Sequence, residues 1–334
     1  MSITPRIRAA FSWLRRHPVW ASLLLFLAGF ATLNLIAYQH ARAMLWFAAG
    51  GPRTVRPQML SWVGKLNVLL TGVRVPRPEN DQFPADLGLD CETTSIPVDS
   101  QVTLEAWFIP SAGARETVVL FHGYAASKSE MLPEAAAFHQ LGLNVWLVDF
   151  RGSGGSSERC TTIGVNEAED VAATVDYLRA HSFGGSLLLY GRSMGAAAIL
   201  RAIHVHDVQP DAVILESVFD RMTTTVGNRF QLMGLPAFPA ANLLIFWGGV
   251  AAGFDGRRHN PAEYAVSCRS PTLMLHGELD PNARLEEGRN VLRNLGDHSS
   301  ELVVFPKTGH SPTLAADPKR WLDAVDRLRR RTRP

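Results

Sequence analysis

The segment Leu-Leu-Leu-Tyr-Gly-Arg-Ser-Met-Gly-Ala-Ala-Ala, residues 187–198, decides the fold. Its first four residues have the character of a buried strand, and they run into Gly-x-Ser-x-Gly, after which a helical pattern begins at Met194. A serine on such a strand-to-helix turn stands above the sheet, and the flanking glycines leave room for its tight backbone. Gly-x-Ser-x-Gly alone is common by chance. The strand before it and the helix after it make Ser193 a candidate nucleophile.

Around this turn, β-rich runs alternate with helical stretches from about residue 88 onward. Several runs are continuously apolar, which is typical of strands covered on both faces. The alternation predicts an α/β fold with a mostly parallel sheet between helices. Expected strands cover 102–109, 117–121, 144–150, 187–190, 212–216, 272–276 and 301–305, and expected helices cover 128–141, 166–181, 194–206, 283–295 and 317–331. Residues 220–264 break the alternation and are expected to form a small lid-like insertion, since the apolar run 241–250 is too short to span a membrane.

A second signal is Phe-His-Gly-Tyr at residues 121–124, directly after an expected strand. A turn there can present a backbone amide to a developing oxyanion, and the helix that begins after the serine presents another. We expect the amides of Tyr124 and Met194 to form this oxyanion hole. The side chain of His122 is expected to support the loop and not to act as the base.

The third and fourth signals are an acid and a histidine that follow later strands. Asp280 lies in the loop after 272–276 and precedes Pro281, so we prefer it to Glu278 as the carboxylate that orients the base. Asp255 and Asp297 are more distant candidates. His310 follows strand 301–305 within Thr-Gly-His-Ser, whereas the remaining candidates lie on a helix or in loops that no strand precedes: His204, His206, His259 and His298. The chain order serine, acid, histidine is typical of α/β-hydrolases.

The N-terminal segment has a different character. Residues 19–38 carry no charge and are long enough to cross a bilayer, with Trp20 and Tyr38 near the ends. We expect a transmembrane signal anchor over 19–39, after a basic segment 1–18. A cleaved signal peptide with Ala41-Arg42-Ala43 as its site is the alternative, and a buried helix is the least favoured interpretation. The arginines around the span are Arg6, Arg8, Arg15, Arg16, Arg42, Arg53 and Arg56.

Residues 40–87 form a connector, which either lies along the membrane surface or packs on the catalytic domain of residues 88–334. The first acidic residue of the chain is Glu79, and an acid-free basic region beside an apolar span favours contact with a lipid surface over nucleic acid. Cys91, Cys160 and Cys268 have no zinc-ligand spacing, and we expect three unpaired, mostly buried thiols; a single disulfide is the alternative if the domain lies outside the cytoplasm.

Residues 100–330 resemble α/β-hydrolases of the serine aminopeptidase-like group, and more closely bacterial membrane-anchored hydrolases similar to mammalian α/β-hydrolase domain-containing lipases and thioesterases. The resemblance implies Ser193, Asp280 and His310 as the triad, no metal or organic cofactor, and loop-steadying roles for Asp149 and Arg151. The sequence departs from many relatives at Asp280-Pro281-Asn282. The matching motifs are FHGY (121–124), DFRGSGGS (149–156), GRSMG (191–195), LES (215–217), NPAEYA (260–265), HGELD (276–280) and TGHS (308–311).

These features predict a serine hydrolase that cleaves an ester or thioester of an acyl or lipid-like substrate. The span and the apolar segment 232–250 motivate the acyl substrate, and the bilayer is the expected partner. We expect a bacterial inner-membrane protein whose catalytic domain lies in the periplasm. Peptide cleavage is the second hypothesis and a non-catalytic binding protein the third. The sequence leaves the oligomeric state open.

Overall fold

The computed structural model describes residues 13, 15–55, 59–181 and 185–332, so Arg6, Arg8 and Arg56 lie outside the described residues. Its centre is an eight-stranded sheet in the order β1-β2-β4-β3-β5-β6-β7-β8. The β1–β2 and β2–β4 pairs are antiparallel, and the other pairs are parallel. The strands are β1 (Glu92–Pro97), β2 (Thr103–Ile109), β3 (Glu116–Phe121), β4 (Asn144–Val148), β5 (Ser186–Arg192), β6 (Ala212–Glu216), β7 (Thr272–Gly277) and β8 (Glu301–Phe305).

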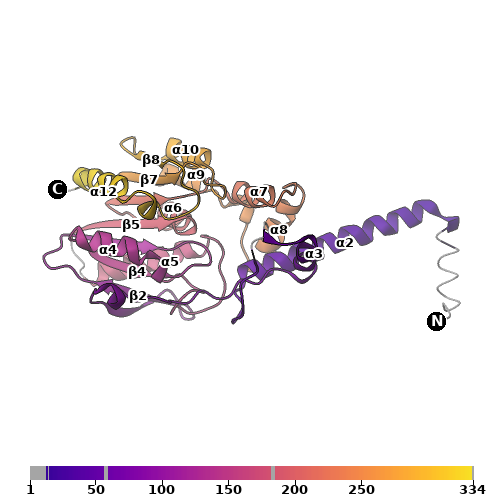
Figure 1. The fold of residues 1–334 in the computed structure, drawn as a ribbon, viewed down its shortest axis with the longest axis horizontal. Helices are drawn as coiled ribbons and strands as arrows, with labels where there is room; N and C mark the ends of the chain where they lie inside the picture. The colour runs from indigo at the N-terminus through magenta and orange to yellow at the C-terminus, as the bar shows by residue number, and fades with distance from the viewer. Residues whose placement is uncertain (1–12, 14, 56–58, 182–184, 333–334) are drawn as a thin grey trace.

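Helices cover both faces of the sheet, as the continuously apolar strands predict (Figure 1). Successive residues of β5 point to opposite faces: Leu189 joins a core with α5 and α6, and Leu188 joins a core with α4 and α12. In the second core, the rings of Phe138 and Trp321 lie 5.0 Å apart. The predicted α/β sandwich is confirmed. Its helices are α4 (Leu132–Gln140), α5 (Glu167–Ala180), α6 (Met194–His206), α9 (Pro261–Tyr264), α10 (Leu285–Asn294), α11 (Thr313–Ala316) and α12 (Pro318–Thr332).

Three details of the sheet differ from the sequence prediction. β1 was not predicted, because only Ile96 of its six residues is buried and polar residues fill most of the strand. An edge strand that is half open to solvent carries no continuous apolar signal. The strand predicted over 144–150 ends at Val148, where the glycine-rich turn begins, and β5 continues beyond its predicted end to Arg192.

The N-terminal helix α2 (Pro18–Leu45) projects away from the α/β domain (Figure 1). Its most apolar 18-residue stretch has no buried residue, so it is not a core helix of this domain. At 1.5 Å per residue its 28 residues extend about 42 Å, more than the roughly 30 Å of a bilayer core. The buried positions Ala37, Ala41 and Leu45 lie in its last turns and repeat every four residues, so they form one contact stripe. The helix is a candidate membrane span whose C-terminal end packs on the protein.

After α2, the connector attaches to the catalytic domain at its two ends. Phe47 N donates to Arg159 O of the domain at 2.8 Å, and Ala48 N donates to Val75 O at 2.8 Å, which joins the two ends of the connector to each other. Arg77 donates to Gly154 O at 2.7 Å, within the glycine-rich turn. Between these ends lies α3 (Trp62–Thr71), which has no buried residue. A short 3-10 helix, η2 (Pro84–Leu87), precedes β1.

The expected insertion lies between β6 and β7 and consists mainly of two helices, α7 (Met222–Leu232) and α8 (Ala240–Ala252). Helix α7 is tied to the loop after β7, because Thr225 Oγ1 and Asn228 Nδ2 both donate to Asn282 O at 3.0 and 3.1 Å. Helix α8 instead packs against α2: Trp247 Nε1 donates to Asn34 Oδ1 at 3.0 Å. The insertion therefore lies between the catalytic loops and the N-terminal helix.

Candidate active site

Ser193 occupies the turn between β5 and α6 with φ 53° and ψ −108°. A positive φ is unfavourable for a residue with a side chain, and such strain is common at functional sites. The two glycines of the motif make the turn possible. A Cβ on Gly191 would lie 2.5 Å from Ala196 N, and one on Gly195 would lie only 2.3 Å from Phe121 O. Glycine is therefore required at positions 191 and 195 for steric reasons, as the Gly-x-Ser-x-Gly pattern predicted.

Gly195→Ala tests this packing. Its new Cβ would also lie 2.8 Å from His122 O, and neither backbone oxygen can move like the end of a flexible side chain. Overpacking of this kind costs about 1–3 kcal/mol, which lowers the melting temperature by roughly 2–4 °C per kcal/mol in a domain of this size. Thermal melting in detergent micelles measures the change. The matched control is Gly227→Ala in α7, where a Cβ meets only Ala237 Cβ at 3.7 Å; equal melting of the two variants would contradict the prediction.

The structure brings Asp280 and His310 together. His310 Nδ1 lies 2.7 Å from Asp280 Oδ2, while Asp280 Oδ1 accepts from Asn282 N at 2.9 Å and Ala283 N at 3.0 Å. Burial alone would raise the pKa of Asp280. The hydrogen bonds from His310 and from the two amides outweigh that effect and lower the pKa below its usual value. Asp280 is therefore ionised at neutral pH, and its carboxylate favours a proton on His310 Nδ1.

The other acids considered from the sequence have different partners. Glu278 is exposed, and its Oε2 accepts from Lys307 N at 3.3 Å. Asp255 caps a short helix through the amide two residues later, and Asp297 accepts hydrogen bonds from two neighbouring serines. Among the four candidate acids, Asp280 is the one that bonds to a histidine side chain in the described part of the chain.

Glu216, at the end of β6, joins the serine turn to the histidine loop. Its main-chain oxygen accepts from Ser193 N at 2.8 Å, and its Oε1 accepts from Thr313 N at 2.6 Å, three residues beyond His310. Its Oε2 accepts from Arg192 Nε at 2.5 Å. Glu216 lies in the LES motif at residues 215–217, but no role was predicted for it from the sequence. A charged residue that ends a fully apolar strand was the available signal, since a buried carboxylate needs partners.

The loop after β3 approaches the serine from another side. A Cβ on Gly123 would lie 3.7 Å from Ser193 Cβ. His122 is fully buried, and its Nε2 accepts from Phe150 N at 3.0 Å. Burial lowers the pKa of His122, so it stays neutral and holds the loop. The two amides expected to form the oxyanion hole belong to the residues that follow this contact in the chain: Tyr124 follows Gly123, and Met194 follows Ser193.

Tyr124 also has a role that the sequence did not indicate. Its hydroxyl donates to Met44 O at 2.7 Å, in the last turns of α2. Burial raises the pKa of Tyr124 to about 12, so the phenol remains a donor at any physiological pH. The expected oxyanion loop is thus bonded to the C-terminal end of the candidate membrane span.

The glycine-rich motif forms buried ion pairs. Asp149 Oδ2 pairs with the fully buried Lys128 Nζ at 2.5 Å, and Asp149 Oδ1 accepts from Lys128 N. Arg151 Nε donates to Asp170 Oδ1 at 2.8 Å. These contacts tie loops to helices, in agreement with the steadying role that the resemblance implied.

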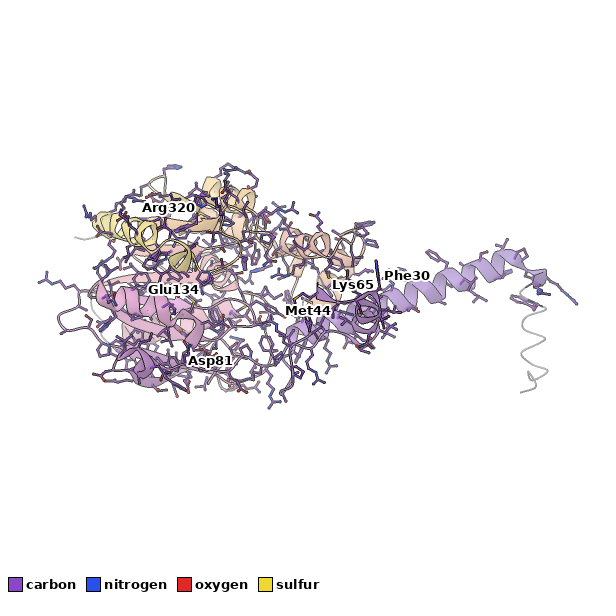
Figure 2. The ribbon with its side chains drawn as sticks, viewed as in Figure 1. Phe30, Met44, Lys65, Asp81, Glu134 and Arg320 are labelled. Carbon is purple, nitrogen blue, oxygen red and sulfur yellow. The ribbon has the colours of Figure 1, made fainter. Side chains whose placement is uncertain are left out.

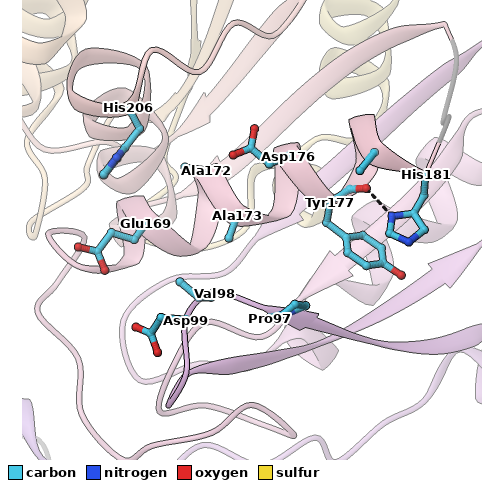
Figure 3. Close-up of a pocket in the computed structure, with 11 residues that line it drawn as sticks. Pro97, Val98, Asp99, Glu169, Ala172, Ala173, Asp176, Tyr177, His181 and His206 are labelled. Carbon is cyan, nitrogen blue, oxygen red and sulfur yellow. Dashed lines mark hydrogen bonds between the residues drawn. The ribbon is translucent and has the colours of Figure 1, made fainter.

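A surface hollow of about 660 Å³ lies elsewhere, between the β1–β2 turn and α5 (Figure 3). Its lining includes Asp99, Glu169 and Tyr177, and His181 at its rim bonds to the main-chain oxygen of Tyr177. None of the three expected triad residues lines it. The hollow is therefore separate from the candidate active site.

Comparisons with known proteins agree with this architecture. Residues 112–241 match the family model described as serine aminopeptidase, S33. Protein bem46 of Schizosaccharomyces pombe is 25% identical over 72% of this chain and 77% of its own length. The Saccharomyces cerevisiae protein YNL320W, whose name calls it a membrane protein, is 24% identical over 70% of this chain and 78% of its own.

Solved structures show the same fold. The Pyrococcus furiosus esterase Pf2001 superposes with a TM-score of 0.65 at 24% identity, covering 77% of this chain and 96% of that one. The Butyrivibrio proteoclasticus protein Est1E, solved with ferulic acid, has a TM-score of 0.58 at 16% identity, covering 72% of this chain and all of that one. The chain therefore has the α/β-hydrolase fold, and its residues 112–241 are similar to the serine aminopeptidase family.

Proposed function

We propose that the protein is a serine hydrolase that cleaves an ester or thioester bond through an acyl-enzyme. The observation that carries the proposal is the His310–Asp280 bond at 2.7 Å, on a loop that Glu216 joins to the strained turn of Ser193. A nucleophile, an orienting acid and a base after the carboxyl ends of the parallel strands β5, β7 and β8 are the parts that this chemistry requires.

In the proposed reaction, Ser193 Oγ attacks the carbonyl carbon while His310 Nε2 accepts its proton. The negative charge that develops on the carbonyl oxygen is met by the amides of Tyr124 and Met194. When the tetrahedral intermediate collapses, the imidazolium returns its proton to the leaving alcohol or thiol. Water then attacks the acyl-enzyme with His310 again as base, and Ser193 is released. Asp280 stabilises the imidazolium in both halves of the reaction.

An acyl or lipid-like substrate is favoured by the surroundings of the site. The insertion is rich in apolar residues, with Leu235, Phe238, Phe246 and Val250 exposed. Two of the structural neighbours are described as an esterase or hold an aromatic acid. Amide hydrolysis is the second candidate, because the matching family model is that of a serine aminopeptidase.

The candidate span suggests where the reaction takes place. We propose a bacterial inner-membrane protein with α2 as its anchor and the catalytic domain in the periplasm. A fusion of a periplasm-dependent phosphatase after residue 80 tests this orientation in cells, with a cytoplasm-dependent reporter at the same position as its counterpart. Activity of the cytoplasmic reporter alone would place the domain on the other side of the membrane.

A pre-steady-state burst tests the proposed chemistry. With p-nitrophenyl butyrate, we expect hydrolysis of the acyl-enzyme to be slower than its formation, which gives a burst of p-nitrophenol close to one per enzyme. A fluorophosphonate probe should react once, with the peptide that contains Ser193.

A panel of acyl esters, acyl thioesters and aminoacyl amides then distinguishes ester or thioester hydrolysis from amide hydrolysis. Modification of a different peptide would contradict the assignment of Ser193.

A further inference from the structure

Helix α3 is apolar, exposed and close to the candidate span. Trp62 is 84% and Val63 78% exposed, and Leu66, Leu69 and Leu70 are exposed too. Lys65 is the one charged residue of the helix, and its Nζ lies 5.2 Å from the centre of the Trp62 ring. An apolar helix with a tryptophan and a lysine at its edge is typical of the membrane interface.

The C-terminal end of α3 contacts the last turns of α2. His40 Nε2 lies 3.1 Å from Leu69 O, 29 residues later. A Cβ on Gly72 would lie 3.9 Å from Ala43 Cβ, and this pair has the same separation in the sequence. Both contacts lie at the C-terminal ends of the two helices, so the end of α3 is held against the last turns of α2, a few residues beyond the uncharged stretch that ends at Tyr38.

Helix α8 of the insertion contacts the same part of α2. Trp247 bonds to Asn34 and packs its ring against Tyr38, with centroids 5.7 Å apart. A Cβ on Gly248 would lie 3.4 Å from Leu45 Cδ1 and 3.8 Å from Ala41 Cβ. The side chains of Phe246 and Val250 on this helix stay exposed. Figure 2 shows Lys65 between Phe30 and Met44 along the molecule, on the side from which α2 projects.

We propose that α3 and the exposed apolar residues of the insertion form a collar around the C-terminal part of α2, which enters the interfacial layer of the lipid bilayer. The collar consists of residues 59–72 together with Leu235, Phe238, Phe246 and Val250. It contains no acidic residue. About 20 residues cross the bilayer core, so a span that begins at Val19 leaves the core near Tyr38, at the level of the collar. The collar holds the hydrolase site at the headgroups, where a lipid-like substrate reaches it without leaving the membrane.

The depth of α3 in the bilayer tests the collar directly. A nitroxide is attached to Val63→Cys, and separately to Leu66→Cys, in the full chain carrying Cys91→Ser and Cys160→Ser; Cys268 is fully buried. In phosphatidylcholine–phosphatidylglycerol proteoliposomes, both labels should collide severalfold more often with oxygen than with a water-soluble nickel chelate. The control is Val266→Cys, 61% exposed on the catalytic domain, where the chelate should dominate. Labels at 63 and 66 that are as accessible to the chelate as position 266 would overturn the collar.

A kinetic experiment tests delivery of substrate and rests on the proposed function. For Val63→Asp/Leu66→Asp in proteoliposomes, kcat/KM should fall at least tenfold with p-nitrophenyl palmitate in the vesicles and less than twofold with soluble p-nitrophenyl acetate. Val266→Asp should change neither. An equal loss with both esters, or no loss with either, would overturn the delivery role. If the wild-type protein hydrolyses neither ester, the proposed function fails, and the nitroxide measurement still decides whether the collar exists.

Discussion

Ser193→Ala is expected to lower kcat for p-nitrophenyl butyrate by about 10⁴- to 10⁶-fold and to abolish labelling by fluorophosphonates. Removal of the hydroxyl leaves no atom that can form the acyl-enzyme, while the turn around it is held by main-chain bonds. Ser193 N still donates to Glu216 O, and the close packing of Gly191 and Gly195 is unaffected. Circular dichroism and melting temperature should therefore match those of the wild type.

The matched control is Ser217→Ala. Ser217 also follows a parallel strand, has a positive φ of 51° and is buried, and its hydroxyl has no hydrogen-bond partner in the described structure. Its removal leaves no polar group unpaired, so kcat should stay within a few-fold of the wild type. If Ser193→Ala retained a burst or probe labelling, the nucleophile would be elsewhere and the proposed mechanism would be wrong.

The sequence predicted the parts of the fold that depend on local patterns. Buried parallel strands are apolar throughout and end at turns with distinctive residues, so seven of the strands were located to within a few residues. β1 was missed because an antiparallel edge strand with one buried residue resembles a polar loop. The spacing of apolar residues along a sequence indicates which faces of a helix or strand are buried. β1 has a single buried residue, which is too few to produce such a pattern.

Contacts between distant segments could not be predicted in the same way. The bond from Tyr124 to the main chain of Met44 joins residues 80 apart, and the bond from Trp247 to Asn34 joins residues 213 apart. Neither pair has a spacing or motif that relates its members. The sequence therefore left open whether the connector touches the membrane or the domain. In the structure the ends of the connector bond to the domain, while the C-terminal end of α3 contacts α2.

Asp280→Asn is the second substitution with a large expected effect, because the geometry dictates how an asparagine would sit. The amides of Asn282 and Ala283 both donate to Asp280 Oδ1, so the carbonyl oxygen of the new side chain must take that position. Its NH₂ group then faces His310 Nδ1, where Asp280 Oδ2 accepts at 2.7 Å. A donor at that place requires His310 Nδ1 to be an acceptor, which moves the ring proton to Nε2.

A histidine protonated at Nε2 cannot accept the proton of Ser193, so kcat should fall by about 10⁴-fold while the fold is retained. Steady-state kinetics with p-nitrophenyl butyrate measure the loss, and nitrogen NMR of the histidine ring reports the change of tautomer. Glu278→Gln is the control, because Glu278 is exposed and accepts only a 3.3 Å bond from Lys307 N among the described contacts. Activity within a few-fold of the wild type is expected for that variant. A greater loss for Glu278→Gln than for Asp280→Asn would transfer the orienting role to Glu278, against the bond that the structure shows.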